Sequence, residues 1–161
     1  MSGQDKLSTR LGALKDAAPA GYAIALHLDF TTPRYLFQTY PAGWRDVYSS
    51  EGLHMQDPTV HWAIQNDGSI SWSDLAEQDS AGVLARAAEY GLNHGVTVAV
   101  QDGSNPTLAS FARSDRPFTE EERAHLEQEV RDLHALTRDV SSLDEQTRDA
   151  LHRLSILYTH A

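Results

Sequence analysis

The sequence contains no cysteine, no excess of basic residues and no long apolar run. Without cysteine the chain can form no disulfide bond and carry out no thiol chemistry, which is compatible with the reducing cytoplasm. No stretch approaches the roughly 18 consecutive apolar residues of a membrane-spanning helix. Residues 1–6 lack the apolar stretch of a secretion signal. Together these absences predict a cytoplasmic protein that does not enter the membrane.

Basic charge is scarce as well, because 13 Lys and Arg stand against 23 Asp and Glu, a formal net charge of −10. Proteins that bind nucleic acids draw their affinity from Lys and Arg side chains that neutralise the phosphate backbone. In this chain the basic residues are scattered along the sequence. We therefore expect no direct binding of nucleic acid by this segment.

The chain has 161 residues, of which 40% are apolar. A chain of this length is typical of one domain, and it can bury roughly 68–70% of the surface of its unfolded state. The sequence predicts that residues 1–140 form this domain and that residues 141–161 form a C-terminal helix or linker. No internal repeat and no low-complexity segment interrupts the chain.

Apolar residues alternate with polar residues in several short segments, which is the pattern of β-strands. Residues 22–30 and 35–39 are predicted to pair as one hairpin, and residues 96–100 and 108–112 as another. Residues 70–72 are a candidate for a short fifth strand. Helices are expected before, between and after these strands. Their expected spans are residues 5–18, 41–52, 57–66 and 79–90, followed by two helices that begin at the capping boxes Thr119/Glu122 and Ser142/Glu145.

This order of elements predicts an α+β fold, a three-layer α-β-α sandwich around a central antiparallel sheet of about five strands. The helices that follow Thr119 and Ser142 carry apolar stripes. Packing against the sheet is the simpler interpretation of these stripes, and a homodimer interface is the alternative.

Motifs of catalysis are missing from the chain. It has no phosphate-binding glycine loop of the GxxxxGK[ST] or GxGxxG type and no GxSxG nucleophile motif. Its eight histidines include no HxH or HxxxH pair, the spacings that favour zinc binding. We therefore expect no enzymatic activity, no metal site and no cofactor.

The segment 40–72 is rich in aromatic residues with a polar tip. Tyr40, Trp44 and Tyr48 follow one another at intervals of four, so Trp44 and Tyr48 share one face of a helix. Asp57 lies nine residues after Tyr48, and Trp72 lies fifteen residues after Asp57. Taken singly, the aromatic residues are typical of a core, and Asp57 before a proline is typical of a helix N-cap. The cap and a binding role are compatible because a carboxylate has two oxygens.

This spacing, W-x3-Y-x8-D-P-x13-W, resembles that of the autoinducer-binding domain of LuxR-type quorum-sensing regulators. The Tyr40-Pro41 pair before the tryptophan is similar to a pair in the family. The segment 91–97 (GLNHGVT) is similar to the family's GL-x2-G-(I/L)-T junction, and residues 108–111 are similar to the strand that closes its pocket. The resemblance covers roughly residues 5–140.

The resemblance implies that the ligand is an N-acyl-homoserine lactone and that it is bound by seven residues: Tyr40, Trp44, Tyr48, Asp57, Thr59, Trp72 and Ser110. The chemistry of the side chains agrees. Trp44 has only a donor, which suits the lactone carbonyl, and ionised Asp57 can only accept, which suits the amide N–H. Tyr40 can donate to the acyl carbonyl.

The remaining predicted contacts are less specific. Ser110 and Thr59 would add a hydroxyl or hold a water, and Tyr48 and Trp72 would form aromatic walls. The acyl tail would lie between the sheet and one helix layer, beside residues such as Ala23, Ala25 and Leu36. Because ligand would fill an apolar space and pair buried polar groups, we expect it to complete the core and stabilise the domain.

Several alternatives remain open from the sequence. A full regulator of the resembling family continues into a helix-turn-helix domain, which these 161 residues do not include. The chain is then either the excised ligand domain of a longer transcription factor or a naturally short receptor that buffers signal or forms inactive heterodimers. A sensor of another small amphiphile, a protein-interaction module and a lactone-hydrolysing enzyme are further hypotheses.

Overall fold

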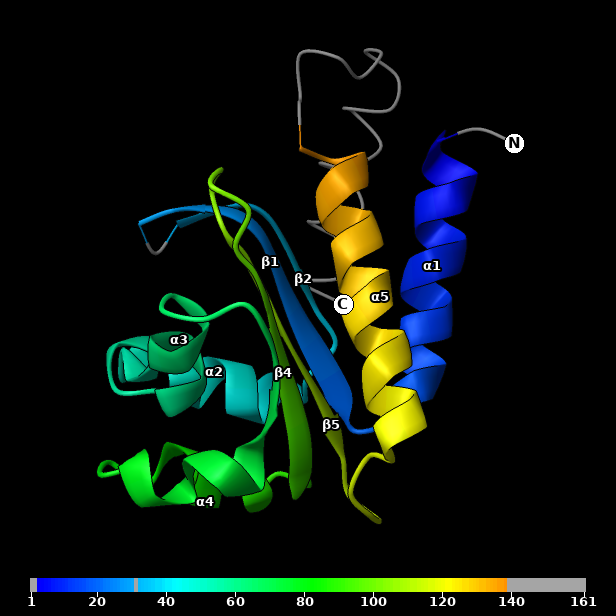
Figure 1. The fold of residues 1–161 in the computed structure, drawn as a ribbon. Helices are drawn as coiled ribbons and strands as arrows, with labels where there is room; N and C mark the ends of the chain where they lie inside the picture. Colours follow the sequence, from blue (N-terminus) through cyan, green and yellow to red (C-terminus); the bar gives the residue numbers. More distant parts are fainter. Residues whose placement is uncertain (1–2, 31, 139–161) are drawn as a thin grey trace.

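The computed structural model describes residues 3–30 and 32–138, and these form three layers (Figure 1). Helices α1 (Gly3–Ala17) and α5 (Glu120–Leu136) stand side by side on one face of the central sheet. The other face is covered by α2 (Ala42–Ser50), α3 (Pro58–Ala63) and α4 (Val83–Ala88), with the 3-10 helices η1 (Leu53–Met55) and η2 (Trp72–Gln78) between them. The predicted three-layer α+β architecture is confirmed.

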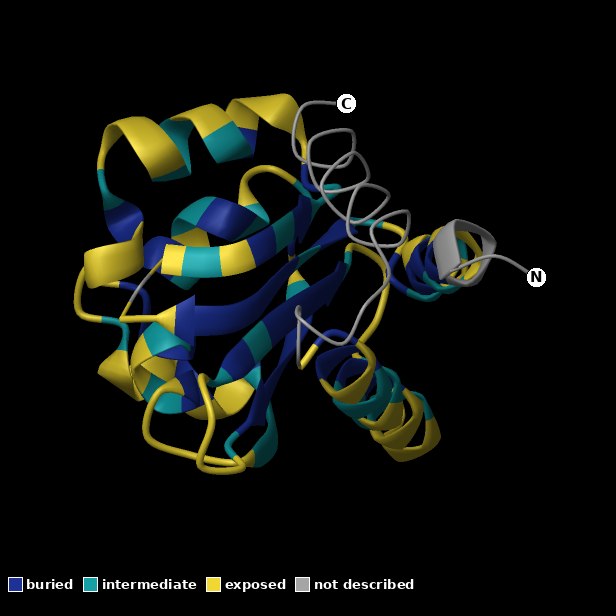
Figure 2. Cartoon of the chain, turned by 90° about the horizontal axis from the view of Figure 1, so that it is seen from above, coloured by how far each residue is buried: buried dark blue, intermediate teal, exposed yellow. Residues whose placement is uncertain are grey.

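The sheet has five strands in the order β2-β1-β5-β4-β3, and every neighbouring pair is antiparallel. These strands are β1 (Gly21–Asp29), β2 (Thr32–Gln38), β3 (Gly68–Ser71), β4 (His94–Val100) and β5 (Thr107–Arg113). Two hairpins, β1–β2 and β4–β5, therefore lie next to each other through the β1–β5 pair, and β3 forms one edge. The sheet is the most buried part of the molecule (Figure 2).

The larger apolar core lies between the sheet and the helix pair α1 and α5. Leu7, Leu11 and Leu14 of α1 are all buried there, as their spacing in the sequence predicts. The start of α5 also agrees with the prediction, because the Thr119 hydroxyl accepts from the Glu122 N–H while the Glu122 carboxylate accepts from the Thr119 N–H. Two of the N–H groups that lack an intrahelical partner at this helix end are thereby satisfied.

One residue interrupts the predicted alternation of β1. His27 has a left-handed φ of +57°, which is uncommon for a residue with a side chain. Its ring lies on the same side of the sheet as the rings and methyl groups of Tyr22, Ile24 and Leu26, and the residues beyond it change faces. Leu28 therefore lines a cavity on the opposite side, and Phe30 is 93% exposed. The alternation through residue 30 was predicted to be continuous, and this local prediction is wrong.

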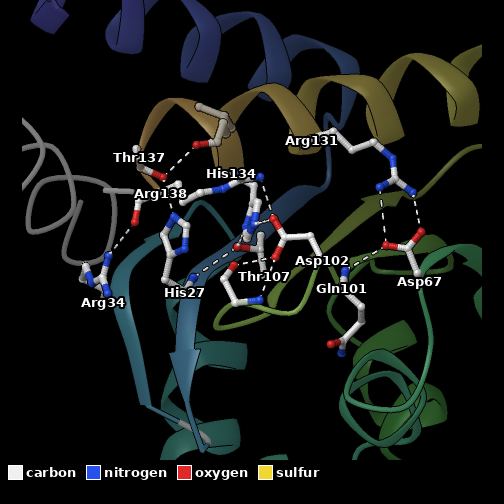
Figure 3. A network of polar contacts seen from close by, with 12 residues as sticks. His27, Arg34, Asp67, Gln101, Asp102, Thr107, Arg131, His134, Thr137 and Arg138 are labelled. Carbon is white, nitrogen blue, oxygen red and sulfur yellow. Dashed lines mark hydrogen bonds and ion pairs between the residues drawn. The ribbon is translucent and has the colours of Figure 1, made fainter. Parts of the chain in front are cut away.

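A hydrogen-bond network on the α5 side holds His27 in this position (Figure 3). The His27 backbone N–H donates to the Thr107 hydroxyl (3.1 Å), and that hydroxyl lies 2.7 Å from Nδ1 of His134. Nε2 of His134 lies 2.9 Å from the Asp102 carboxylate, which can only accept. His134 thus donates from Nε2, and its Nδ1 accepts the hydrogen of Thr107.

The same network reaches the end of α5. The Thr137 hydroxyl donates to the Leu133 carbonyl (2.7 Å), so it accepts from Nε2 of His27 at 2.9 Å. The rings of His27 and His134 are stacked with centroids 4.6 Å apart. Hydrogen bonds from Ser104, together with the bond from His134, hold the pKa of the Asp102 carboxyl well below its usual range. These contacts tie β1, the β4–β5 turn and the last turn of α5 together.

Some predicted boundaries need correction. The helix expected over residues 79–90 is the shorter α4, because the Asp79 carboxylate caps it from outside by accepting from the N–H groups of Val83 and Leu84 (both 2.8 Å). Trp72 begins η2 instead of ending β3. The helix expected after Ser142 and the predicted boundary at residues 140/141 lie outside the described residues. Within the described ranges, no helix combines the length and apolar character needed to cross a membrane.

Candidate ligand-binding site

A cavity of about 390 Å³ lies between the sheet and the layer formed by α2, α3 and α4. Its size falls within the roughly 300–1,000 Å³ of small-molecule sites, and most of its lining is apolar, as is usual for such sites. All seven residues predicted as ligand contacts line this cavity: Tyr40, Trp44, Tyr48, Asp57, Thr59, Trp72 and Ser110. Ala23, Ala25 and Leu36, beside which the acyl tail was predicted, line it as well.

Two glycines shape the floor at one end of the cavity. A Cβ at Gly21 would lie 2.8 Å from Cδ1 of Tyr40, and a Cβ at Gly95 would overlap the ring of Trp72. Gly21 and Gly95 both pair with Ala112 of β5, so they belong to one cross-strand row of the sheet. The two aromatic rings therefore lie directly on the sheet. This explains the second glycine of the GLNHGVT segment, Gly95, which allows the indole of Trp72 to lie directly against β4.

The indole of Trp44 is the clearest unpaired donor of the site. Trp44 is 4% exposed, and its ring packs against those of Tyr48 and Tyr90 with centroids 5.7 and 5.6 Å away. Within residues 3–30 and 32–138 its Nε1–H has no hydrogen-bond partner, although the side chain lines the cavity. The nitrogen is not among the fully enclosed unpaired atoms, so its N–H is open to the cavity although the ring is buried. An acceptor held in the cavity can therefore pair with it.

The Asp57 carboxylate is the matching acceptor. Its Oδ1 accepts from the backbone N–H of Thr59 (2.8 Å) and from the Thr59 hydroxyl (2.7 Å), so Asp57 is the N-cap of α3 as predicted. Its Oδ2 accepts from the Tyr48 hydroxyl at 2.7 Å. A carboxylate has about four acceptor positions, so one remains on Oδ2. The two roles weighed for Asp57 are thus compatible in one geometry.

Burial determines the protonation of this group and its neighbours. Desolvation raises the pKa of Asp57 above its ordinary value of 3.8, and the charge of Asp79 acts in the same direction, while the bonds from Thr59 and Tyr48 oppose them. Burial and the nearby Asp57 also raise the pKa of Tyr40 and of Tyr48, so both phenols are neutral donors. A further N–H donor at Asp57 would stabilise its ionised form.

Tyr40 and Ser110 meet above the sheet. The Tyr40 hydroxyl donates to the Ser110 carbonyl over 3.3 Å, at the long end of the range for such bonds. The side chains of Trp72, Thr97 and Ser110 form a chain, in which Nε1–H of Trp72 donates to Oγ1 of Thr97 (3.0 Å) and that oxygen lies 2.7 Å from Oγ of Ser110. Trp72 is therefore both a wall of the cavity and a hydrogen-bond donor to the sheet.

Sequence reasoning missed other residues of the site. Thr97 is fully buried and makes both bonds just described, but only the register of β4 and β5 reveals it. Gln38 of β2 also lines the cavity. Leu28 reaches the cavity because of the backbone change at His27, which no periodicity indicates. Thr59 differs from the prediction in detail, since its hydroxyl hydrogen is used on Asp57.

The arrangement is suited to binding. The site combines the unpaired indole donor of Trp44, an acceptor with spare capacity on Asp57 and a long apolar wall. No group of three or more His, Cys, Asp or Glu residues that could hold a metal ion occurs among the described residues. We expect such a set of groups to orient an amphiphilic molecule with a polar head and an apolar tail.

Comparison with known proteins decides the family. The family model described as "Autoinducer binding domain" matches residues 18–142. The chain belongs to this family. The domain is thus related to transcriptional regulators that bind autoinducers, as its resemblance to the LuxR type predicts, and the expectation that it is not an enzyme agrees with that membership.

Curated relatives support the assignment. The domain is 34% identical over 76 residues to the transcriptional activator protein SolR of Ralstonia nicotianae, a match that covers 47% of this chain and 32% of SolR. It is 24% identical over 126 residues to the HTH-type quorum-sensing regulator RhlR of Pseudomonas aeruginosa, covering 76% of this chain and 52% of RhlR. The domain thus spans about a third to a half of the length of these relatives.

Solved structures show the same fold. SdiA in complex with octanoyl-rac-glycerol matches with a TM-score of 0.64 at 20% identity, covering 86% of this chain and 60% of SdiA. The N-acylhomoserine lactone dependent LuxR family factor CepR2 of Burkholderia cenocepacia matches with a TM-score of 0.62 at 14% identity, covering 96% and 86% of the two chains. At these identities the likeness establishes the fold alone.

Proposed function

We propose that the domain binds an N-acyl-homoserine lactone in the cavity and is stabilised by it. The observation that carries this proposal is that an unpaired hydrogen-bond donor and a partly unused acceptor line the same cavity. The indole N–H of Trp44 opens on the cavity and lacks an acceptor within the described residues, and the Asp57 carboxylate that lines the same cavity retains one acceptor position. A lactone carbonyl and an amide N–H on one small molecule satisfy both.

Each polar side chain then has a defined role. Trp44 donates to the lactone carbonyl, Asp57 accepts from the amide N–H, and Tyr40 turns from its long bond with the Ser110 carbonyl towards the acyl carbonyl. Tyr48 and Thr59 hold the Asp57 carboxylate in place through its other three acceptor positions. The acyl tail lies along Ala25, Leu36 and neighbouring apolar residues of the lining.

Binding of this kind would complete the core on the α2–α4 side. A ligand present at 100 times its dissociation constant adds about 2.7 kcal/mol to the free energy of unfolding. It would also pair the indole of Trp44 and fill apolar space between the two layers. The domain is therefore expected to be markedly more stable with ligand than without it.

Thermal unfolding with a series of N-acyl-homoserine lactones tests the proposal. We expect the midpoint of unfolding to rise with the lactone and to depend on acyl length, because the tail contacts the apolar lining. Homoserine lactone without an acyl chain serves as the control and should have little effect. Mass spectrometry of molecules extracted from the purified protein identifies a co-purified signal. A midpoint that does not respond to any lactone would contradict the proposal.

A second candidate ligand class is a monoacylglycerol, because SdiA, which shares the fold, has been solved with octanoyl-rac-glycerol. Such a molecule has an ester carbonyl for Trp44 and hydroxyl groups for Asp57 but no amide N–H. Octanoyl-glycerol is therefore included beside octanoyl-homoserine lactone. Tighter binding of the glycerol ester would favour this second class.

At the level of the whole protein we propose that the domain is the cytoplasmic signal-sensing part of a transcription regulator, whose DNA contacts are made by another segment. Residues 1–140 would form the sensing unit and 141–161 its connection. A short receptor that buffers signal or forms inactive heterodimers is the alternative. Sedimentation with and without lactone tests for the expected homodimer, and gel-shift assays of this chain should show no DNA binding.

A further inference from the structure

Gln38 is a polar residue beside the apolar stretch of the cavity wall formed by Ala23, Ala25 and Leu36. It is the last residue of edge strand β2, it is half-buried, and it lines the cavity. Within the described residues its side-chain amide has no hydrogen-bond partner. A partly desolvated amide without a partner is unfavourable, and it offers two donors and an acceptor to any molecule beside it.

The register of the sheet places Gln38 relative to the rest of the site. Gln38 pairs with Ala23, and Ala23 pairs with Ser110 on its other side. Side chains directly opposite one another share a face of the sheet, so Gln38 and Ser110 flank the small methyl group of Ala23. Their Cα atoms are about two strand spacings apart, ~10 Å. The two side chains thus border a shallow channel whose floor is Ala23.

This row lies between the two ends of the cavity. The row on one side contains Gly21, over which Tyr40 packs at the head-group end. The row on the other side contains Leu36, Ala25 and Leu108, all apolar and all lining the cavity. A chain that runs from the head-group end into the apolar part must cross the row of Gln38 and Ser110 directly after its first carbonyl.

The hydrogen of the Ser110 hydroxyl is directed by its neighbours. Trp72 donates to Oγ1 of Thr97, and Thr97 is fully buried with Ser110 as its other hydroxyl partner. The hydrogen of Thr97 is therefore donated to Ser110, since no other acceptor for it occurs in the described residues. The hydrogen of Ser110 then has no acceptor on the sheet. It is available to the cavity.

We propose that Gln38 is a specificity-determining residue. Together with Ser110 it selects a 3-oxoacyl chain, in which C3, counted from the amide carbonyl carbon as C1, carries a ketone oxygen. A ketone oxygen has two lone pairs, which match one hydrogen from Ser110 and one from the Gln38 amide. A methylene at that position leaves both donors unpaired. This inference rests on the proposed binding of N-acyl-homoserine lactones and names the chain they carry.

The test compares two ligands that differ by one oxygen. We expect the unmodified protein to bind N-(3-oxooctanoyl)-homoserine lactone about 3- to 30-fold more tightly than N-octanoyl-homoserine lactone, as measured by calorimetry. Gln38→Met, which keeps the length of the side chain, should reduce that ratio about 2- to 10-fold. Ser110→Ala should reduce it by a similar factor. The ratio is insensitive to losses of affinity that both ligands share.

A second measurement needs no ligand. Because the Gln38 amide has no partner in the described residues, Gln38→Met should leave the unfolding midpoint of the free protein unchanged or raise it. The matched control is Gln101→Met, since the Gln101 amide donates to the Ala63 carbonyl at 3.0 Å. That variant should unfold at a lower temperature. A fall of the midpoint for Gln38→Met equal to that for Gln101→Met would overturn the inference.

The outcomes separate this inference from the proposed function. If the protein binds both lactones and the ratio is unchanged in Gln38→Met, Gln38 does not select the chain, while lactone binding stands. If no lactone binds, the proposed function fails and the assignment of a 3-oxoacyl chain fails with it. A preference for the octanoyl ligand over the oxo ligand in the unmodified protein would also overturn the inference.

Discussion

On the α5 side of the sheet, the buried hydroxyls of Thr107 and Thr137 each accept one hydrogen bond and are donors in another. On the opposite side, the buried indole of Trp44 has no partner within the described residues, and the Asp57 carboxylate has a raised pKa. The first region is built on β1, β5 and the end of α5, and the second on α2 and the start of α3. On the α5 side the polar groups are paired with one another, including His134 with Asp102. Around the cavity, by contrast, a donor and an acceptor position remain without a partner in the described residues.

The difference distinguishes two uses of buried polar groups. A network whose members satisfy one another fixes the structure, and here it holds the left-handed backbone of His27 against its conformational cost. Groups that stay unsatisfied reduce stability until a ligand pairs them. We infer that the sheet acts as a rigid support on the α5 side and as a receptor surface on the other.

The largest effect is expected from opening the α5-side network. Thr107→Val keeps the shape of the side chain but leaves the His27 N–H and Nδ1 of His134 without their partner. Two such losses should lower the free energy of unfolding by about 4 kcal/mol, measured by urea denaturation. Thr32→Val, on an exposed position of β2, should change it by less than about 0.5 kcal/mol. Similar values for the two variants would show that the network contributes nothing.

Acid should weaken the same network. Burial lowers the pKa of His27 from 6.5 to about 4, with charges of His134, Arg34 and Arg138 acting in the same direction and Asp102 against them. The unfolded chain takes up a proton near pH 6.5 and the folded chain only near pH 4. Stability is therefore complete above pH 6.5 and falls by about 3 kcal/mol as the pH drops to 4.

Denaturation at pH 7, 5.5 and 4.5 measures this loss. The control is His27→Asn, because asparagine tolerates a left-handed backbone and does not titrate in this range. The variant should be less stable at pH 7 and should lack this part of the pH dependence. If it loses as much stability as the unmodified protein between pH 7 and 4.5, another group is responsible.

Substitutions at the cavity are expected to change the affinity for ligand more than the stability of the free protein. Asp57→Asn keeps an acceptor for the Thr59 N–H, and asparagine is a good N-cap, so the free protein should unfold at nearly the same temperature. Loss of the charged acceptor should weaken lactone binding by about 2 kcal/mol, roughly 30-fold. Asp67→Asn is the matched control, since the Asp67 carboxylate accepts from the Gln101 N–H and from Arg131 and is not part of the cavity lining. Equal affinity in both variants would contradict the role given to Asp57.

The smallest effect concerns the unpaired indole itself. Trp44→Phe retains an aromatic ring and removes a donor that has no protein partner in the described residues, so stability without ligand should change little. Lactone affinity should fall by about 1 kcal/mol, roughly 5-fold, in calorimetry. Trp62→Phe, at a tryptophan outside the cavity lining, should leave affinity unchanged. A large loss of stability in Trp44→Phe would mean that the indole is paired within the protein.

The sequence predicts those parts of the molecule that depend on local chemistry. The spacing of Leu7, Leu11 and Leu14, and the capping box of Thr119 and Glu122, place two helices that the structure confirms. The resemblance carried by the W-x3-Y-x8-D-P-x13-W spacing implies that Trp44 and Asp57 meet at one site, and both line the cavity. These signals are carried by residues close together in the chain.

Features that depend on contacts between distant residues were not predicted. His27 turns its strand because of Thr107 and Thr137, which lie 80 and 110 residues away. Thr97 becomes part of the site only through the register of β4 with β5. A polar residue on an edge strand, such as Gln38, is expected to face solvent, and only the cavity lining shows its position in the site. In each case the decisive partner lies on another strand or helix.

The two glycines beneath Tyr40 and Trp72 have a consequence for evolution of the site. No larger residue fits at Gly21 or Gly95 without displacing an aromatic ring, so the depth at this end cannot vary by substitution. Ala25 and Leu108, further along the floor, already carry side chains and can be exchanged for smaller or larger ones. Descendants of this protein that respond to new signals should therefore keep the glycine pair and diversify where the tail ends.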